Sequence, residues 1–245
     1  MLSKAKIKFI KSLQVKKYRK QEQCFVVQGA KSVQELLASD FEVSLVLGTA
    51  DFFAHTSQQI HAETIEVTAK ELTDLSEFQT NDSALAVARL KLNHPLTIRP
   101  NTFALVLDDI RDPGNLGTII RTADWFGIHT IIASDETADF YNPKVISATM
   151  GSFVRVEIYY TNLEDYLGKT TLPVFGAYLD GKDVHHTSFG SSGLIVIGNE
   201  SRGISDSLEK FITDKITIPR YGQAESLNAA IATAVICDNI VRHKA

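Results

Sequence analysis

The sequence predicts an α/β protein whose second half is built on a mainly parallel sheet, with helices on both faces and a smaller α/β unit before it. Three observations predict this class. From residue 103 onward, short apolar runs alternate with helical patterns, as in parallel strands joined by covering helices. Residues 25–90 hold a separate set of short strands and helices. Between them, residues 91–101 contain two prolines and little periodicity, which is typical of a linker.

The first predicted domain covers residues 1–90. Short apolar runs in it predict strands, and apolar residues at helical spacing predict helices. In chain order the strands are 25–27, 43–47, 65–67 and 84–90, and the helices are 30–37 and 70–75. Before them, Ile7, Ile10 and Leu13 recur at helical spacing between lysines. This spacing predicts one ordered basic helix at residues 1–20.

The second predicted domain covers residues 102–245. Its strands are predicted at 103–107, 129–133, 154–158, 173–178, 194–197 and 214–218. Its helices are predicted at 116–127, near 143–150, and at 162–167, 204–210 and 226–242. Alternation of this kind places the carboxyl ends of the strands at one edge of the sheet, where ligands of α/β proteins bind.

Charge is distributed unevenly along the chain. Residues 1–20 contain eight lysines and arginines and no acidic residue, while the remainder carries 17 cations against 29 acids, a net charge of −12. Two interpretations are open: a phosphate-binding segment, or a solvated terminus that aids solubility. The apolar residues at helical spacing favour an ordered basic segment.

Other features exclude several classes of protein. No run approaches the roughly 18 apolar residues of a membrane span. The two cysteines, Cys24 and Cys237, lie in apolar patterns, which predicts buried thiols in a reducing cytoplasm. The pair His185-His186 would point in opposite directions on an extended strand. We therefore expect a cytoplasmic protein that binds neither a membrane nor a metal.

The first polar cluster runs from residue 112 to residue 121. Pro113 and Gly114 form a tight turn after the apolar run 103–107, and Asn115 is positioned to cap the helix that follows. Arg121 lies off the apolar stripe of that helix and could pair with the nearby acid or stack on the nearby tryptophan. A helix cap and a surface ion pair would also explain these two residues.

Two further polar clusters follow predicted strands. They are Gly198-Asn199-Glu200 and Ser226-Leu227-Asn228. Gly198 would allow a ligand to approach the backbone, and Ser226 is predicted to cap the last helix, which leaves Asn228 without a structural reason. Together with the first cluster they predict one composite site. The glycine fingerprint of dinucleotide-binding enzymes is missing.

Taken together, these three clusters resemble the SpoU (TrmH-type) family of RNA ribose 2′-O-methyltransferases, in the SPOUT superfamily. Order and spacing both agree. The matching segments are 108–123, 197–204, 218–219 and 225–228. More weakly, residues 5–90 resemble the ribosomal-protein-like RNA-binding domain of the family, with an early signature at 25–31.

The resemblance implies a C-terminal trefoil knot, an exception to the usual rule that chains are unknotted. It also implies that S-adenosylmethionine binds in that knot and that two subunits complete the site, so we expect a homodimer. The cofactor would contact Gly198, Ile218 and Leu227, largely through backbone groups, and we expect Asn199 beside them. The catalytic and substrate-facing residues would be Asn115, Arg121, Glu200, Ser226 and Asn228.

The activity that the resemblance implies is methyl transfer to a ribose 2′-hydroxyl, which makes RNA the substrate. The family's proposed base corresponds to Arg121. Because a guanidinium pKa exceeds about 12, Arg121 could instead stay charged, bind a phosphate and stabilise the developing alkoxide. Both roles stay open.

RNA would be located by the first domain, and the predicted contacts are Lys4, Lys8, Lys11, Lys16, Lys17, Arg19 and Lys31. Because relatives with a separate N-terminal domain act on ribosomes, 23S ribosomal RNA is favoured over transfer RNA. A non-catalytic RNA-binding protein of the same fold and a dinucleotide-dependent enzyme are the alternatives. Departures from the family pattern occur at Gln28, Ser147 and Arg220-Tyr221.

Overall fold

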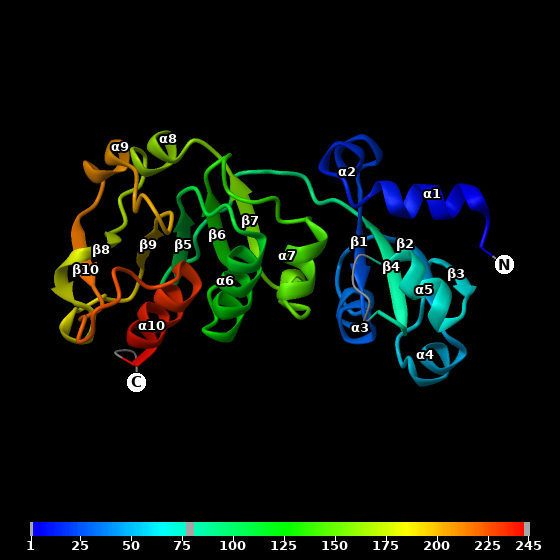
Figure 1. The fold of residues 1–245 in the computed structure, drawn as a ribbon. Coiled ribbons are helices and arrows are strands. Elements are labelled where there is room, and N and C mark those ends of the chain that lie inside the picture. The colour runs from blue at the N-terminus through cyan, green and yellow to red at the C-terminus, as the bar shows by residue number, and fades with distance from the viewer. Residues whose placement is uncertain (1, 77–80, 243–245) are drawn as a thin grey trace. The chain divides into compact units, whose positions relative to one another are not determined.

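A computed structural model describes residues 2–76 and 81–242, and these form two compact units (Figure 1). Unit 1 comprises Met1–Leu92 and Asp139–Val154, and unit 2 comprises Asn93–Ala138 and Arg155–Ala245. The sequence analysis counted residues 139–154 with the second half. The structure groups them with unit 1, where α7 (Pro143–Ala148) packs against the first strand.

Unit 1 contains a four-stranded sheet in the order β1-β4-β2-β3. Strands β1 and β2 pair antiparallel with β4, and β3 pairs parallel with β2. The strands are β1 (Cys24–Gln28), β2 (Val43–Gly48), β3 (Glu63–Glu66) and β4 (Ala84–Arg89). Besides α7, the helices are α1 (Lys4–Ser12), α2 (Lys16–Glu22), α3 (Ala30–Leu37), α4 (Ala50–His55) and α5 (Ala69–Leu75), with a short 3-10 turn η1 (Ser152–Val154). Helix α4 was not predicted.

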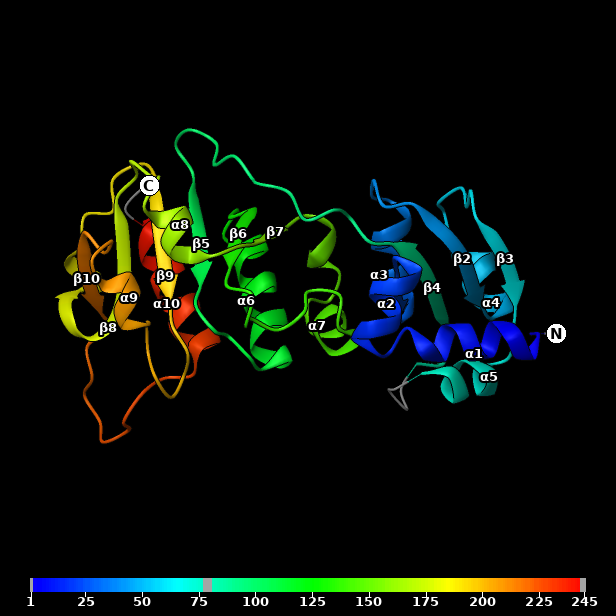
Figure 2. The same cartoon turned by 90° about the horizontal axis from the view of Figure 1, so that it is seen from above.

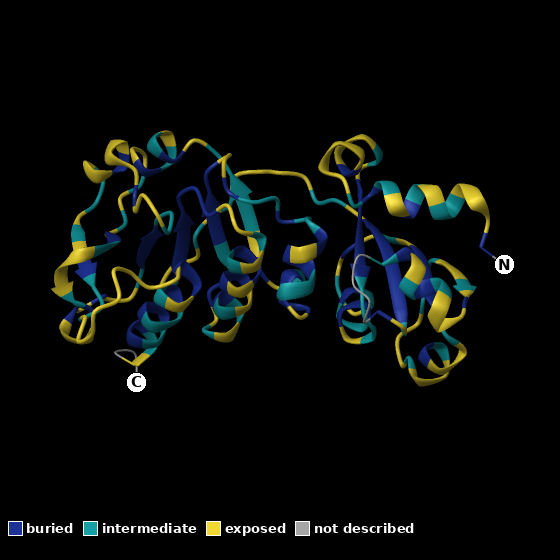
Figure 3. Ribbon diagram, viewed as in Figure 1, coloured by how far each residue is buried: buried dark blue, intermediate teal, exposed yellow. Residues whose placement is uncertain are grey.

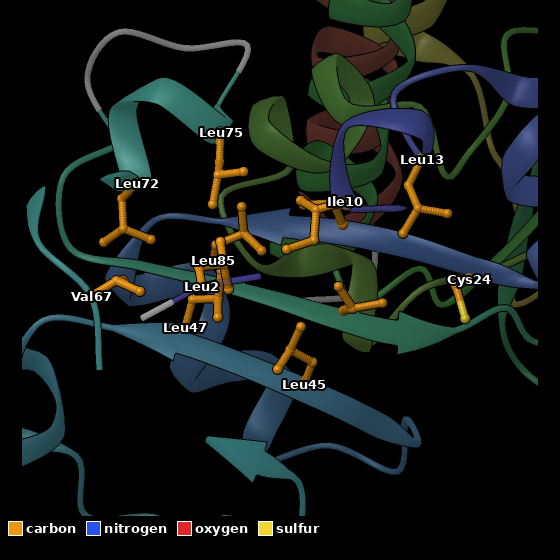
Figure 4. Packing of buried hydrophobic residues seen from close by; sticks show 12 residues of the cluster. Leu2, Ile10, Leu13, Cys24, Leu45, Leu47, Val67, Leu72, Leu75 and Leu85 are labelled. Carbon is orange, nitrogen blue, oxygen red and sulfur yellow. The ribbon is translucent and has the colours of Figure 1, made fainter. Parts of the chain in front are cut away.

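Helices α1 and α5 supply part of the hydrophobic core of unit 1 (Figure 4). Ile10 of α1 and the following Leu13 are almost completely buried, as are Leu72 and Leu75 of α5. They pack against leucines and valines of the strands. Because burial of such side chains stabilises by roughly 1.5–3 kcal/mol each, α1 is held firmly, with its lysines on the opposite side.

The predicted single helix at residues 1–20 is wrong, because the chain turns between α1 and α2. Arg19 explains the turn: its Nη1 donates to the carbonyls of Leu13 at 2.8 Å and Gln14 at 2.7 Å, and its Nη2 donates to Asp139 at 2.6 Å. The Arg19 side chain is only 2% exposed. This engagement argues against the predicted RNA contact of Arg19, whose guanidinium instead fixes the turn.

Unit 2 contains a six-stranded sheet in the order β10-β8-β9-β5-β6-β7, and its pairs are parallel. The strands are β5 (Phe103–Leu107), β6 (Thr130–Ala133), β7 (Glu157–Tyr160), β8 (Val174–Asp183), β9 (Gly193–Ile197) and β10 (Asp214–Thr217). The helices are α6 (Pro113–Trp125), α8 (Leu163–Leu167), α9 (Asp206–Glu209) and α10 (Ala229–Arg242), with a 3-10 turn η2 (Val184–His186).

Helices cover both faces of this sheet (Figures 1 and 2). On one face, α8 and α9 pack over apolar side chains of β5, β8 and β9. On the other face, α6 and α10 pack against each other, and the strands between the layers are buried (Figure 3). The predicted fold class is therefore confirmed. The implied trefoil knot stays a prediction.

Several predicted boundaries in unit 2 are wrong, and two of them matter for the site or its connections. Strand β7 begins at Glu157 rather than at 154, because residues 152–154 form a 3-10 turn. Helix α10 begins at Ala229 rather than at 226. Within residues 2–76 and 81–242, no helix has both the length and the apolarity needed to cross a bilayer.

The strand order places the site. Strand β5 lies between β9 and β6, so the sheet extends in opposite directions from the β9–β5 pair. At such a reversal the loops after the two strands diverge and leave room for a ligand. Here these loops are residues 108–112, which lead into the first polar cluster, and residues 198–205, which contain the second.

Candidate active site

Three predicted residues from three distant segments meet in one hydrogen-bonded chain. Asn228 Nδ2 donates to Asn115 Oδ1 at 2.8 Å, and Asn115 Nδ2 donates to the carboxylate of Glu200. The carboxylate can only accept, which fixes the orientation of the Asn115 amide. The predicted composite site therefore forms within unit 2.

Asp112, not Asn115, caps helix α6. Its side chain accepts from the backbone N–H of Asn115 at 2.8 Å, and Pro113 occupies the first turn. The predicted cap at Asn115 is therefore wrong. Because Asp112 satisfies the helix end, the side chain of Asn115 is free to bind Glu200 and Asn228.

Asn228 has the structural reason that the sequence did not reveal. Its Oδ1 accepts from the N–H groups of Ala230 at 2.9 Å and Ile231 at 3.3 Å, at the start of α10. The predicted cap at Ser226 is wrong, since Ser226 lies in an exposed segment two residues earlier. One asparagine thus starts α10 with its oxygen and orients Asn115 with its nitrogen.

Asn199 holds the loop after β9. Its backbone N–H and C=O pair with Gly203 at 3.0 and 2.8 Å, and its Oδ1 accepts from Ser201 N at 2.9 Å. Its Nδ2 donates to the carbonyl of Asp109 at 2.9 Å. Every polar group of Asn199 has a partner, which argues against the predicted cofactor contact and assigns it a positioning role.

Asp109 joins the two loops a second time. It is 8% exposed and adopts a left-handed conformation with φ 59°. Arg111 Nε donates to one oxygen of the carboxylate at 2.6 Å, and Arg202 Nη2 binds the other. The two arginines thus clamp the Asp109 carboxylate between the two loops. The hydrogen bond to Asp109 raises the pKa of Arg111, so the Arg111 guanidinium stays charged.

A pocket of about 580 Å³ opens beside this clamp, at the carboxyl ends of the strands. Carboxylates dominate its charge: Asp108, Asp109, Asp135, Glu136, Glu164 and Asp206 line it, against Arg111 and Arg202. Such a surface repels phosphate. This pocket is therefore unsuited to the RNA backbone, and Asn115 and Asn228 do not line it.

The protein's own backbone leaves no room for a side chain at position 198, which therefore requires glycine. A Cβ there would lie 2.2 Å from the carbonyl carbon of Gly203 and 2.3 Å from the N of Ile204. The close approach expected from a ligand is thus made by the protein's own loop. Its contact with the cofactor stays a prediction.

Arg121 is not gathered into the hydrogen-bonded chain. It is exposed on α6 and forms no ion pair or cation–π contact with any residue in the described ranges. Asp124, one of its two predicted partners, binds Arg155 at 2.9 Å instead. The other, Trp125, is 84% exposed. Among the described residues of a single subunit, the Arg121 guanidinium therefore has no ion-pair or cation–π partner.

The segment between β10 and α10 is open. Residues 220–228 are exposed, and the described structure contains no backbone–backbone hydrogen bond from residues 221–227. Leu227 is 46% exposed. Ile218 follows Thr217, whose hydroxyl donates to the carbonyl of Leu179 at 3.1 Å.

Leu179, next to this segment, was missed by the sequence analysis. Strand β8 continues past its predicted end at 178, and its pairing with β10 jumps from Gly176 to Lys182, so the residues between bulge out. The bulge leaves Leu179 79% exposed. No periodicity marks such a bulge, and only its Asp-Gly sequence hinted at a turn.

Six of the seven predicted RNA-contacting residues are exposed on unit 1: Lys4, Lys8, Lys11, Lys16, Lys17 and Lys31. None of them forms an ion pair with the residues that the structure describes, in contrast to Lys6, which binds Glu63. These charges are therefore available to an anionic partner.

The two cysteine thiols are unsuited to nucleophilic chemistry. Burial raises the pKa of the Cys237 thiol to about 12, and burial also raises that of Cys24. Neither thiol is suited to act as a nucleophile. Across residues 2–76 and 81–242, no group of three or more His, Cys, Asp or Glu could hold a metal ion.

Comparison with known proteins identifies the family of the chain. Residues 102–238 match the model of the SpoU rRNA Methylase family, and residues 4–86 match the MRM3-like substrate binding domain. The chain belongs to the SpoU rRNA methylase family. The second match lies within unit 1.

Several relatives are similar over nearly the whole chain. The 23S rRNA (guanosine(2553)-2′-O)-methyltransferase RlmP of Bacillus subtilis is 29% identical over 94% of both chains. A TrmH-family RNA methyltransferase structure, described as putative, from Porphyromonas gingivalis is 38% identical, covers 98% of both and has a TM-score of 0.89. The AdoMet-bound rRNA methyltransferase of Sinorhizobium meliloti is 27% identical, covers 99% of this chain and 96% of its own, and has a TM-score of 0.85.

Family membership confirms the predicted class of enzyme, an RNA ribose 2′-O-methyltransferase that uses S-adenosylmethionine. The roles of individual residues are a separate matter. They stay predictions, which the contacts above support to different degrees.

Proposed function

We propose that this protein transfers a methyl group from S-adenosylmethionine to a ribose 2′-hydroxyl of 23S ribosomal RNA. The observation that carries the proposal is the meeting of Asn115, Glu200 and Asn228 from three separate family motifs. The similarity to RlmP along 94% of both chains supports 23S rRNA over transfer RNA. The free thiols Cys24 and Cys237 suit a reducing cytoplasm, where we expect the reaction to occur.

The described residues fit the cofactor. Leu179, whose carbonyl accepts from Thr217 at the end of β10, and Leu227 are both exposed and offer apolar surface for an adenine ring. The backbone groups of residues 221–227 have no backbone partner in the described chain and are free to bind the polar parts of a ligand. We assign the cofactor to Gly198, Ile218 and Leu227. When bound, it supplies a methyl group already activated for transfer.

The protein must then orient the ribose and manage one proton. The Asn115–Glu200–Asn228 chain provides fixed polar groups, and the Ser226 hydroxyl is exposed nearby in sequence. Arg121 would place its charge next to the RNA phosphate and stabilise the alkoxide as the 2′-hydroxyl loses its proton. A guanidinium group holds its proton tightly in proteins, which favours this role over that of a base.

A second copy of the chain would bring Arg121 to the site. Trp125 on α6 and Ile231 on α10 are 84% and 53% exposed, on two helices that pack together. Exposed apolar side chains on neighbouring helices are typical of a subunit interface. We propose a homodimer through this face. Trp125→Glu should convert it to monomers in light-scattering chromatography and reduce methylation, and a dimer that persists would contradict this interface.

The lysines of unit 1 would bind the RNA backbone. Deleting residues 1–20 would not test this cleanly, because Ile10 and Leu13 belong to the core. Lys8→Ala and Lys11→Ala preserve the fold. Each should reduce the dependence of log Kd on log salt by about one phosphate contact. An unchanged slope in both variants would contradict the role.

The direct test is transfer of labelled methyl from S-adenosylmethionine to RNA isolated from a strain that lacks the gene. Labelled 23S rRNA, with a new 2′-O-methyl mark at one nucleotide, is the expected result. Label in transfer RNA alone would show that the substrate is transfer RNA and not 23S rRNA. Absence of label from all RNA, with S-adenosylmethionine still bound, would favour a non-catalytic RNA-binding protein.

A further inference from the structure

An exposed aromatic side chain stands among the lysines of helix α2. Tyr18 is 41% exposed and the preceding Val15 is 51% exposed. Neither is needed for the core of unit 1. No described ring or cation lies against Tyr18, and no described residue forms a hydrogen bond with its hydroxyl. One face of α2 therefore offers an apolar surface without a partner.

The charges around Tyr18 identify the kind of partner. Lys16, Lys17 and Lys20 are exposed within one turn of it, and no ion pair occupies them among the described residues. The first acidic residue of the chain is Glu22, at the end of α2. On a helix Lys17 flanks Tyr18, whereas Lys16 and Lys20 lie around the other side of the same short helix. A short helix that carries an exposed ring and three unpaired lysines suits a polyanion that also has flat apolar faces.

Helix α2 holds the backbone that carries this ring in a fixed position. Although α2 has only seven residues, Arg19 next to Tyr18 is buried and donates to two backbone carbonyls and to Asp139. Such an anchor lowers the backbone entropy lost when a ligand binds.

Resting on the proposed function, we propose that Tyr18 is a base-stacking residue of the RNA site. An unpaired nucleotide of the substrate stacks on the Tyr18 ring, while Lys17 binds an adjacent phosphate and Lys16 and Lys20 bind phosphates further along the strand. Bases in a duplex are already stacked on each other, whereas bases in loops and single strands are free to stack on protein. The substrate region bound by α2 is therefore single-stranded or looped RNA.

The test compares the full-length protein and three variants on a single-stranded oligoribonucleotide and on a duplex of the same sequence. Tyr18→Ala should weaken binding to the single strand about tenfold, leave binding to the duplex nearly unchanged, and leave the salt dependence unchanged. Tyr18→Phe keeps the ring and should bind like the wild type. Lys17→Ala, the matched control, should weaken both complexes and reduce the salt dependence.

Equal losses on both RNAs in Tyr18→Ala, or a Tyr18→Phe variant as weak as Tyr18→Ala, would overturn the inference. A second measurement is independent of folding in the variants: 4-thiouridine in the single strand should cross-link to Tyr18 of the wild type on irradiation. Cross-links that map only elsewhere would also overturn it. Methyl transfer by the wild type is measured in parallel, so that failure of stacking with intact activity is distinguished from failure of the proposed function.

Discussion

The two segments that enter helices α6 and α10 differ in how they are held. Residues 108–115 are fixed by the Asp109 clamp, by the Asp112 cap and by hydrogen bonds to the loop after β6. Residues 220–228 are exposed, and the described contacts within them amount to one weak hydrogen bond from Arg220 to Ala224 at 3.4 Å before Asn228 caps α10.

This difference indicates that the two halves of the site have different tasks. The braced segment sets the position of Asn115 before any ligand arrives, which is the preorganisation that a methyl transfer geometry needs. The open segment holds Ser226 and Leu227, and the cofactor would order it on binding. Figure 3 shows buried strands in the sheet of unit 2 and an exposed segment that leads into α10.

The largest effect is expected at Arg121, which lies on the braced side but contacts neither segment. Arg121→Ala should lower the methylation rate by about a hundredfold to a thousandfold through lost transition-state stabilisation, with cofactor affinity unchanged. Arg242→Ala, on α10, is the matched control and should be near wild type. Turnover by Arg121→Ala close to the control would remove Arg121 from the mechanism.

Two glycines compare the segments directly. Gly198→Ala would force a Cβ to within 2.2 Å of the Gly203 backbone, and should destabilise the fold by about 3 kcal/mol or more. Gly222→Ala, in the open segment, meets nothing within 4 Å. It should be neutral or stabilise by about 0.5 kcal/mol. Denaturant unfolding measures both, and equal effects would contradict the contrast.

The cofactor should change only the open segment. At a concentration of a hundred times its Kd, S-adenosylmethionine should stabilise the fold by about 2.7 kcal/mol and slow amide hydrogen exchange at residues 221–227. Residues 108–115 should exchange slowly with or without it. Rapid exchange in 108–115 of the free protein would show that the hydrogen bonds there do not brace it.

The smallest effect is expected at Asn228, where two substitutions separate its two roles. Asn228→Asp keeps the oxygen that accepts from Ala230 and Ile231 but loses the N–H that orients Asn115, so stability should be near wild type while methylation falls. Asn228→Ala loses both, and should also lower the free energy of unfolding by about 1 kcal/mol. Full activity in Asn228→Asp would show that the link to Asn115 is dispensable.

The sequence predicted which residues come together, but it did not predict the structural role of each of them. The meeting of Asn115, Glu200 and Asn228 followed from motif spacing. The choice of Asp112 over Asn115 as the cap could not, because aspartate and asparagine cap helices about equally well. The burial of Arg19 depends on Asp139, 120 positions later. In a run of lysines nothing marks that one cation as internal.

The bulge in β8 and the short helix α4 were beyond sequence periodicity for a related reason. A register jump of several residues in a parallel pair has no repeating pattern, and a helix of six residues spans less than two turns. Long, regular elements such as α6 and α10 were found, with errors of a few residues at their starts.

The ring that Asn199 and Gly203 close with two hydrogen bonds fixes the length of the loop after β9. One inserted residue would separate the paired groups and move Glu200 away from Asn115. The segment 220–227 has no such closure among the described contacts, and longer surface loops cost little entropy. Insertions and engineered changes in substrate preference therefore belong in segment 220–227. The loop after β9 does not accommodate an added residue.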